Sequence, residues 1–346
     1  GCRVWLVQVH LPDGRLAGLA PLAETVHGGG LLRWRRLSLL GTERVDPDHT
    51  DMLALPEHEA GAARAVLEAL LARAAEWDVL YLHALWPDAA LRTVLPGIAR
   101  KDGLRVNERE NFSCPYTTLP GTWEAFEQER LSRIQRKKVR RYVRKLEEDF
   151  PGQVAYRPID TPEALTAAFD RLVRYHRDRM AALGKTHDAF DTPALVRFHR
   201  TVAEAFLRRG WLHFHALTVT GEDVALLYCF RYGGRVYDYQ SGYNMGWSDY
   251  SPGHLLTAHS IRRAIELGVH EYDMLLGAEE YKTHYADQRR SDINVEVVTS
   301  FPAGRRRIQL RNGLRGLRRG LRALHPQRLR ARLERLLRSP VEAPEA

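Results

Sequence analysis

Residues 236–244 read VYDYQSGYN, an aromatic-rich alternation that predicts a half-buried strand. Residues 250–256, YSPGHLL, then signal the start of a helix. Ser251 is a good N-cap residue, and Pro252 suits the first helical position because no N–H partner is needed there. This stretch therefore predicts a strand that leads into a capped helix.

The same order repeats in the residues that follow. The helix is expected to continue over residues 257–267 and to end at Gly268. A second strand is expected over residues 269–276, and residues 277–282, GAEEYK, are expected to open another helix. The whole stretch predicts a βαβ unit with a further helix N-terminus at its end.

A helix N-terminus that follows a strand has a known chemical use. Its first turn presents unpaired N–H groups and a partial positive charge, which suit phosphate oxygens. Gly253 in that turn would let a bulky anion approach the backbone closely. Spacing alone, however, favours an ordinary βαβ unit with a well-capped helix.

Three segments carry a resemblance to the Gcn5-related N-acetyltransferase (GNAT) superfamily: residues 239–243 (YQSGY), 251–256 (SPGHLL) and 273–282 (DMLLGAEEYK). More narrowly, they resemble the CelD/BcsL-type acetyltransferases of bacterial cellulose and exopolysaccharide biosynthesis, relatives of Fem-type peptidoglycan aminoacyltransferases. The resemblance extends diffusely from about Leu16 to about Val298. It implies a mixed α/β class with a tandem GNAT-like fold, in which helices flank a central mixed sheet.

Length and composition set limits on the protein. The 346 residues are enough for two domains, and no apolar run approaches the roughly 18 residues of a membrane span. No secretory signal is visible, but Gly1 already leads into a strand pattern, so we expect the natural chain to begin earlier. Cys2, Cys114 and Cys229 are far apart, which fits a reducing compartment and predicts neither disulfides nor a metal site.

The first part of the chain predicts a β-hairpin, with strands at residues 5–9 and 16–22. Further strands and helices are expected in alternation, over residues 31–40, 61–75, 78–83 and 89–99. Under the resemblance, residues 1–120 form a degenerate GNAT-like domain that packs on a second one.

A basic helix is expected over residues 123–148. It carries eight cations in the thirteen residues from Arg133 to Lys145, which suggests contact with nucleic acid or nucleotide phosphates. The alternative is a solvated linker helix whose Ile134, Val139, Tyr142 and Leu146 face inward. The resemblance favours the alternative, because the family has a basic helix here, residues 121–150, that bridges its domains.

The second domain is expected over residues 151–302 and, under the resemblance, is the catalytic one. A strand at residues 154–157 precedes helices at residues 162–180 and 193–209. Two strands, residues 212–219 and 224–230, then flank a hairpin turn and lead into the βαβ stretch.

Charge is concentrated in the tail, residues 303–346. Its thirteen arginines and three glutamates give it +10, against +9 for the whole chain, so the remainder is close to neutral. Leucines at four-three spacing predict an apolar stripe on an arginine-rich helix, namely Leu310, Leu314, Leu317, Leu321 and Leu324. Residues 303–338 could contact an anionic membrane surface, a polyanion or a partner, or cover their own domain. The resemblance favours the membrane surface.

The resemblance also implies where an acyl donor, acetyl-CoA or another acyl-CoA, would bind. It places the donor at Ser251, Gly253, His254 and Leu255, with a splayed strand at Gln240, Ser241 and Gly242 above. The turn holds one glycine where the superfamily usually has two or more. Aminoacyl-tRNA, the donor of Fem-type enzymes, is therefore the alternative.

Catalysis in such enzymes needs a base, an acid and a group that polarises the thioester. Asp273 at its strand end, or Glu279 just after it, is predicted to be the base, although Asp273 could instead cap the following turn. Tyr281 is predicted to be the acid, and Lys282 to stabilise negative charge. The acceptor is expected near three further residues, His176, Arg179 and Tyr239.

Together these observations predict a cytoplasmic acyltransferase, or one peripheral to the inner membrane. It would transfer an acyl group from acyl-CoA to an amine or hydroxyl of a sugar or cell-envelope precursor. The alternatives are a Fem-type transferase that uses aminoacyl-tRNA and a non-catalytic GNAT-fold scaffold for a polysaccharide synthase.

Overall fold

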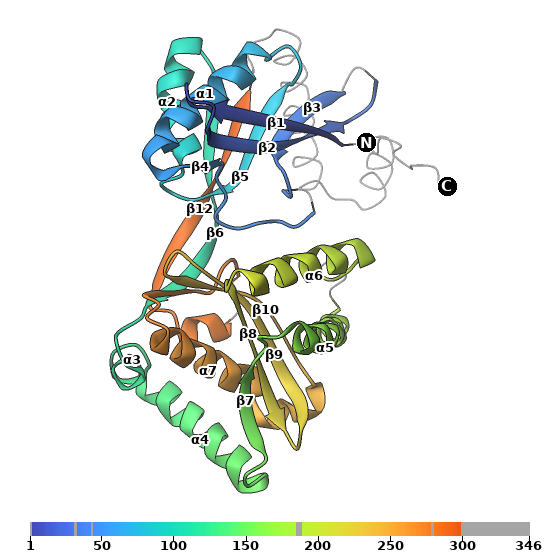
Figure 1. Cartoon of the computed structure of the whole chain (residues 1–346), viewed down its shortest axis with the longest axis vertical. Helices are drawn as coiled ribbons and strands as arrows, with labels where there is room; N and C mark the ends of the chain where they lie inside the picture. The colour runs from blue at the N-terminus through green and yellow to red at the C-terminus, as the bar shows by residue number, and fades with distance from the viewer. Residues whose placement is uncertain (1, 31–32, 43, 185–188, 278–279, 299–346) are drawn as a thin grey trace, which may run out of the picture. The chain divides into compact units, whose positions relative to one another are not determined.

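The computed structural model describes residues 2–30, 33–42, 44–184, 189–277 and 280–298. The chain divides into two compact units, Gly1–Asn111 with Asp292–Ala346, and Phe112–Ser291 (Figure 1). The chain crosses between the units within β6 (Arg105–Thr118) and within β12 (Gln288–Val298). The tail from residue 303 lies outside the described residues, so its predicted helix stays a prediction.

The first unit is a sheet with two covering helices. Its strands follow the order β1-β2-β3-β5-β12, with β4 paired to β2, and β3 runs parallel to β5. The elements are β1 (Arg3–His10), β2 (Leu16–His27), β3 (Trp34–Leu39), β4 (Leu53–Ala54), η2 (Pro56–His58), α1 (Glu59–Ala72), β5 (Val79–Leu85) and α2 (Ala90–Asp102). Buried leucines of the strands and of both helices form one core, including Leu37, Leu67, Leu80 and Leu95.

The second unit has a sheet in the order β6-β11-β10-β9-β8-β7, in which β10 and β11 run parallel. Its helices are α3 (Trp123–Glu129), α4 (Arg133–Asp149), α5 (Pro162–Ala182), α6 (Pro193–Arg208) and α7 (Pro252–Glu266), with short 3-10 helices η3 (Met245–Tyr250) and η4 (Glu280–His284). Its remaining strands are β7 (Val154–Pro158), β8 (Leu212–Val219), β9 (Glu222–Tyr232), β10 (Arg235–Tyr243) and β11 (Glu271–Asp273).

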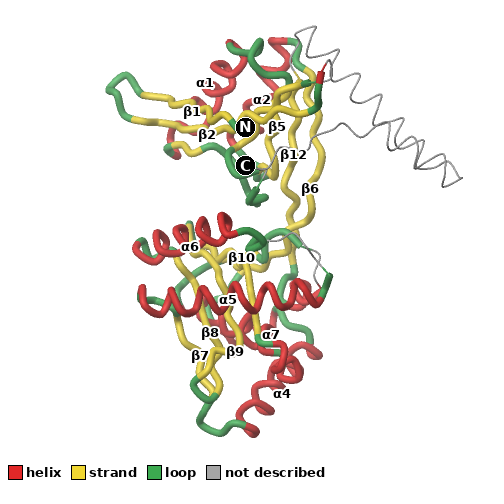
Figure 2. The backbone as a smooth tube through the Cα atoms, turned by 90° about the vertical axis from the view of Figure 1, so that its right-hand side faces the viewer, coloured by secondary structure: helices red, strands yellow, loops and turns green. Residues whose placement is uncertain are grey.

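Strand β9 shows how the two faces of this sheet are covered (Figure 2). Its alternate residues Leu227 and Cys229 belong to a core shared with α4 and α7, whereas Leu226 and Tyr228 belong to a core shared with α5 and α6. The period of two is what places successive side chains on opposite faces. Helices therefore cover both faces, as the mixed α/β prediction requires.

Several boundaries differ from the sequence-based expectations. The single helix expected over residues 123–148 is two helices, because Ser132 caps a new one by accepting a hydrogen bond from the Gln135 N–H (3.2 Å). Strands β6 and β12 were not expected. In β6 the charged residues between Arg105 and Glu110 obscure the apolar alternation.

The βαβ stretch is also shorter than expected at its end. Strand β11 has three residues in place of the eight expected over residues 269–276. The Asp273 carboxylate accepts a hydrogen bond from the Leu275 N–H (2.8 Å), and Leu275 adopts a left-handed φ of 54°. This turn ends the strand, and the helix expected at residue 277 is reduced to η4 within the described residues.

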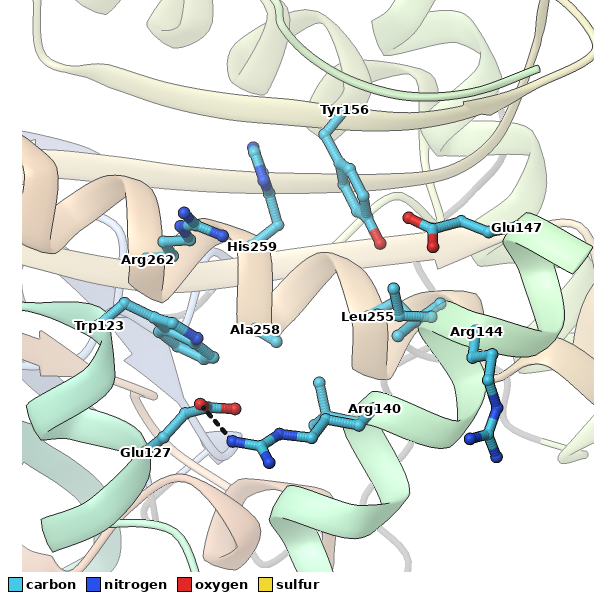
Figure 3. Close-up of a pocket in the computed structure, with 12 residues that line it drawn as sticks. Trp123, Glu127, Arg140, Arg144, Glu147, Tyr156, Leu255, Ala258, His259 and Arg262 are labelled. Atoms are coloured by element: carbon cyan, nitrogen blue, oxygen red, sulfur yellow. Dashed lines mark hydrogen bonds and ion pairs between the residues drawn. The ribbon is translucent and has the colours of Figure 1, made fainter. Parts of the chain in front are cut away.

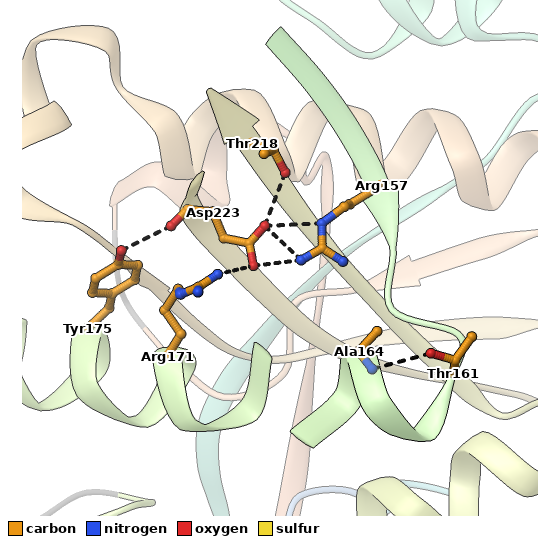
Figure 4. A network of polar contacts seen from close by, with 7 residues as sticks. All are labelled: Arg157, Thr161, Ala164, Arg171, Tyr175, Thr218 and Asp223. Atoms are coloured by element: carbon orange, nitrogen blue, oxygen red, sulfur yellow. Dashed lines mark hydrogen bonds and ion pairs between the residues drawn. The ribbon is translucent and has the colours of Figure 1, made fainter. Parts of the chain in front are cut away.

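A buried carboxylate ties α5 to the β-hairpin of this unit (Figure 4). Asp223, 2% exposed, accepts hydrogen bonds from both Arg157 and Arg171, with Arg157 bound at 2.7 and 2.8 Å. The Thr218 hydroxyl also donates to it at 3.0 Å. One carboxylate thus joins β7, α5 and the turn between β8 and β9.

We expect Asp223→Asn to lower the free energy of unfolding by about 3 kcal/mol, because two arginines lose a shared buried anion. The matched control is Asp170→Asn, whose carboxylate is 66% exposed and pairs with Arg200. It should change stability by less than about 1 kcal/mol. Urea unfolding followed by circular dichroism measures both. Equal losses would mean that the buried network does not hold the hairpin.

In the second unit, His199, His213 and His215 are buried, and none of them makes an ion pair with another described residue. Burial lowers the pKa of His199 to about 4, of His213 to about 4 and of His215 to about 2. His213 Nε2 lies 3.0 Å from the Ser260 hydroxyl, which in turn contacts the Tyr272 hydroxyl at 2.9 Å. The folded protein therefore holds these imidazoles neutral.

Stability should fall as the pH is lowered from about 6.5. Each histidine is protonated in the unfolded chain below that pH but stays neutral in the folded chain, so each lowers the free energy of unfolding by about 1.4 kcal/mol per pH unit until its folded pKa is reached. Urea titrations between pH 7 and pH 5 measure this slope. His215→Phe should reduce this slope by about 1.4 kcal/mol per pH unit, the contribution of one bound proton. An unchanged slope would contradict the view that His215 is held neutral in the folded protein.

Candidate functional site

The site begins where β10 separates from β11. The two strands pair only from Arg235 to Tyr237, whose partner is Asp273. Strand β10 continues to Tyr243 on its other side, paired with β9. Over residues 240–243, the edge of β10 that faces away from β9 has no strand partner within the described chain. The predicted donor residues Gln240, Ser241 and Gly242 lie on this open edge.

Helix α5 packs closely behind the open edge. His176 Nδ1 lies 3.3 Å from the Ser241 carbonyl oxygen. A Cβ at Gly242 would lie 3.0 Å from the His176 N, the Leu172 O and the Tyr175 Cβ, so only glycine fits there without movement. The structure thus brings the predicted acceptor residue His176 next to the predicted donor strand.

The start of α7 meets the end of β10. Gly253 lies in the first turn of α7, and a Cβ on it would be 3.7 Å from Cδ1 of Tyr243, the last residue of β10. This is an ordinary contact, so packing alone does not require glycine at position 253. The Arg179 guanidinium, predicted to lie near the acceptor, sits 5.8 Å from the centre of the same Tyr243 ring.

The helix start itself differs in detail from the sequence-based expectation. Pro252 is the first helical residue, as expected, but Ser251 has a left-handed φ of 48° and its side chain does not cap the helix. Instead, a hydrogen bond with Ser251 lowers the pKa of the Tyr142 phenol, so the Ser251 hydroxyl contacts α4. Among the residues that the structure describes, no hydrogen-bond acceptor contacts the Gly253 or His254 N–H groups, so this turn has the geometry of an anion-binding helix start.

Cationic groups surround this turn, but His254 is not one of them. Burial, and then the charge of Lys138, lower the pKa of His254 to about 4, so its imidazole is neutral at neutral pH. The Tyr285 hydroxyl lies 3.1 Å from its Nδ1. Positive charge near the turn therefore comes from Lys138 of α4, from Arg179 of α5 and from the helix N-terminus.

Helix α4 also holds the segment that precedes α7. Lys145 Nζ donates to the Asp249 carbonyl at 3.4 Å and lies 4.4 Å from the centre of the Tyr250 ring. Phe150 packs on Trp247 and Tyr250, with ring centres 5.1 and 5.8 Å apart. These contacts fix η3 and so the position at which α7 begins.

The predicted catalytic residues lie just beyond β11. Asp273 is fully buried, accepts from the Leu275 N–H and lies 3.6 Å from Arg290 Nε. With these contacts, Asp273 caps the turn that follows β11. This is the structural role that the sequence offered as the alternative to a catalytic base. Arg290 also binds Glu271 at 2.8 Å and stacks on Tyr116.

The other predicted catalytic residues are only partly described. Lys282 is buried, and its Nζ donates to the Leu276 carbonyl at 2.6 Å. Tyr281 is half-buried in η4, and Glu279 lies outside the described residues. The catalytic roles of these three residues and of Asp273 stay predictions.

Two predicted site residues, Tyr239 and Leu255, make their side-chain contacts elsewhere than at the Gly253 N–H group. Tyr239 sits at a β-bulge between the pairs Asp238–Cys229 and Gln240–Tyr228, and its hydroxyl lies 3.2 Å from His199 Nε2. Leu255 is buried and borders a separate cavity of about 400 Å³. The structure therefore groups the remaining predicted donor residues with His176 and Arg179, but not these two.

The cavity lies between α3, α4, β7 and α7 (Figure 3). The Trp123 and Tyr156 rings border it, and Tyr156 stacks on His259 with ring centres 4.5 Å apart. Charges of both signs surround its opening, including Arg140, which binds Glu127 at 3.0 Å. This cavity includes none of residues 240–243 of the open β10 edge and, from the first turn of α7, only Leu255.

The sequence did not single out Tyr142 as a member of the site, whereas Lys138 and Lys145 belong to the cationic run for which contact with nucleotide phosphates was one interpretation. The inward position predicted for Tyr142 on the basic helix was a partial signal, since Tyr142 does face α7. The contact with Ser251 depends on how α4 crosses α7, which no local pattern contains.

Comparisons with known proteins bear on the family and the fold. Residues 133–283 match the sequence model of a family described as "Acetyltransferase (GNAT) domain". A search of curated proteins finds no significant match. The narrower CelD/BcsL-type assignment stays a prediction.

Solved structures share the fold across both units. FemX is similar with a TM-score of 0.56 and 12% identity, over 85% of this chain and 88% of that chain. The C-terminal domain of a putative lysylphosphatidylglycerol synthetase from Agrobacterium fabrum has a TM-score of 0.53 and 10% identity, over 86% and 85% of the two chains. L-PGS from Bacillus licheniformis has a TM-score of 0.52 and 11% identity, over 88% and 87%. At these identities the likeness concerns the fold.

No helix in the described part of the chain has the length and apolar character needed to span a bilayer.

Gly242→Ala should destabilise the protein by about 1–3 kcal/mol, because the new methyl group must displace α5 from β10. Chemical denaturation gives the value. Gly121→Ala is the matched control, since nothing lies within 4 Å of a Cβ there, and it should change stability by less than about 0.5 kcal/mol. A tolerated Gly242→Ala would show that α5 does not pack as closely as described.

Proposed function

We propose that this protein transfers an acyl group, most simply acetyl, from an acyl-CoA to an amine or hydroxyl of a sugar or cell-envelope precursor. The acceptor attacks the thioester directly. The chain would act in the cytoplasm or at the inner face of the membrane. The narrower assignment to exopolysaccharide or cellulose biosynthesis rests on the resemblance of its motifs alone.

One observation carries the donor half of this proposal: the open edge of β10 and the first turn of α7 meet at Tyr243. Main-chain groups at residues 240–243 are free of a strand partner on the open side, so they suit the amide groups of a pantetheine arm. The Gly253 turn, with Lys138 and Arg179 nearby, suits its pyrophosphate. Both features suit the two halves of a coenzyme A thioester, its pantetheine arm and its pyrophosphate.

The acceptor half rests on the groups around His176. It lies behind Ser241, so an acceptor held near α5 would approach the same strand that binds the donor. Asp273 or Glu279 would take the proton of the attacking group, Tyr281 would protonate the leaving thiolate and Lys282 would stabilise negative charge. These roles are part of the proposal.

A second candidate donor is aminoacyl-tRNA. The cationic α4 beside the α7 turn and the fold shared with FemX favour it. This donor would bind through many phosphates, so its affinity should fall steeply with salt.

Calorimetric titration with acetyl-CoA tests the donor assignment. Gly253→Ala should keep the melting temperature within about 2 °C, because its methyl group makes only an ordinary contact with Tyr243. It should nevertheless weaken acetyl-CoA binding, because the methyl group occupies the approach to the turn. Gly253→Trp should abolish binding.

Lys138→Gln should weaken acetyl-CoA binding by roughly 5- to 10-fold through the loss of one phosphate contact. The control is Lys101→Gln, on α2 of the other unit, which should bind as the unmodified protein does. Absence of acetyl-CoA binding, together with salt-sensitive binding of charged tRNA, would replace this proposal with the Fem-type alternative.

A further inference from the structure

The outer face of α4 carries a row of exposed cations that are not part of the proposed donor site. We call it the α4 cationic face and define it by Arg133, Lys137, Arg141 and Arg144, all exposed. Positions three and four apart lie on the same side of a helix, so these side chains follow one another along its length. At ~1.5 Å per residue the row extends over ~17 Å.

Most of this charge is not neutralised by the protein itself. Arg144 lies 3.7 Å from Glu148, and both side chains are exposed, so this pair is weak. Among the described residues, no ion pair is recorded for Arg133, Lys137 or Arg141. By contrast, two other cations of α4 are engaged by the protein: Arg136 donates to the Glu127 carbonyl oxygen at 3.0 Å, and the exposed Arg140 binds the Glu127 carboxylate at 3.0 Å.

An apolar side chain projects beside these charges at the N-terminal end of α4. Ile134 is 75% exposed, the largest fraction among the exposed large apolar residues of the described chain. It was expected to face inward, and the break before Ser132 resets the helix so that it faces solvent instead. Met245, 46% exposed, lies on η3, the segment that packs on the other end of α4.

We propose that the α4 cationic face docks on an anionic lipid bilayer, with Ile134 inserted between headgroups. A helix lying in the plane of the membrane combines cations that contact lipid phosphates with an apolar side chain that enters the interface. A single-stranded nucleic acid is the weaker fit, because base stacking needs exposed aromatic rings and the described cationic face has none. The inference rests on the proposed acyl-CoA donor, because an aminoacyl-tRNA would itself contact the cations of α4.

Vesicle co-sedimentation of the full-length protein tests this proposal. Vesicles of phosphatidylglycerol and phosphatidylcholine in a 3:7 ratio should bind it, and pure phosphatidylcholine vesicles should bind it far less. Removing Arg133 and Lys137 together, as R133Q/K137Q, should weaken binding roughly 25-fold, at about 5-fold per charge. Ile134→Ser should weaken it about 5-fold with no change in net charge.

The matched control is R100Q/K101Q, which removes two exposed cations from the last turn of α2. It should leave vesicle binding unchanged within about twofold. Equal weakening by both double variants would mean that net charge alone drives the binding, and this would overturn the proposal. Binding that R133Q/K137Q leaves intact would also overturn it, since the tail or another surface would then be responsible.

An RNA of tRNA size serves as the competing partner in the same experiment. If R133Q/K137Q loses affinity for the RNA while vesicle binding stays unchanged, the face is a nucleic-acid surface and the lipid proposal fails. Circular dichroism of every variant shows that α4 is intact. Acetyl-CoA titration of R133Q/K137Q should match the unmodified protein, because neither residue lies at the Gly253 turn.

Discussion

The short pairing of β10 with β11 is the constraint on which the site depends. The two strands share three residue pairs and then separate, because Asp273 accepts the Leu275 N–H and the chain turns with a left-handed φ at Leu275. Asp273 is fully buried, and Arg290 lies beside it. Had β11 continued to residue 276, it would have filled the edge of β10 that now lies open.

A second constraint is the position at which α7 begins. Ser251 does not cap the helix with its own side chain; it contacts Tyr142, while Lys145 and Phe150 hold the segment before it. The basic helix is therefore neither a simple solvated linker nor a purely polyanion-binding element. Its inner side fixes the turn of α7, and its outer side remains free to meet another surface.

Burial in the second unit decides which histidines can carry a positive charge. Burial lowers the pKa of His254 to about 4, and of His213 likewise, so the imidazoles near the sheet are neutral. A phosphate at the α7 turn would thus be met by main-chain N–H groups, Lys138 and Arg179, and by His254 only as a neutral ring.

The sequence alone determined the order of most elements and predicted where the candidate site lies. The period of two in residues 236–244 and the Ser251-Pro252 signal are local, so they predicted β10 and the start of α7 correctly. A local pattern could not predict the early end of β11, which depends on a carboxylate folding back onto its own turn. Nor could it predict β6, whose charged residues hide its alternation.

Only the tertiary structure decided which predicted residues meet. Gly242 lies against His176 because α5 crosses behind β10, and Ser251 contacts Tyr142 because α4 crosses α7. Tyr239 faces His199 across a bulge that no residue spacing signals. Such contacts join positions tens of residues apart, and packing geometry, not local propensity, sets the distances between them.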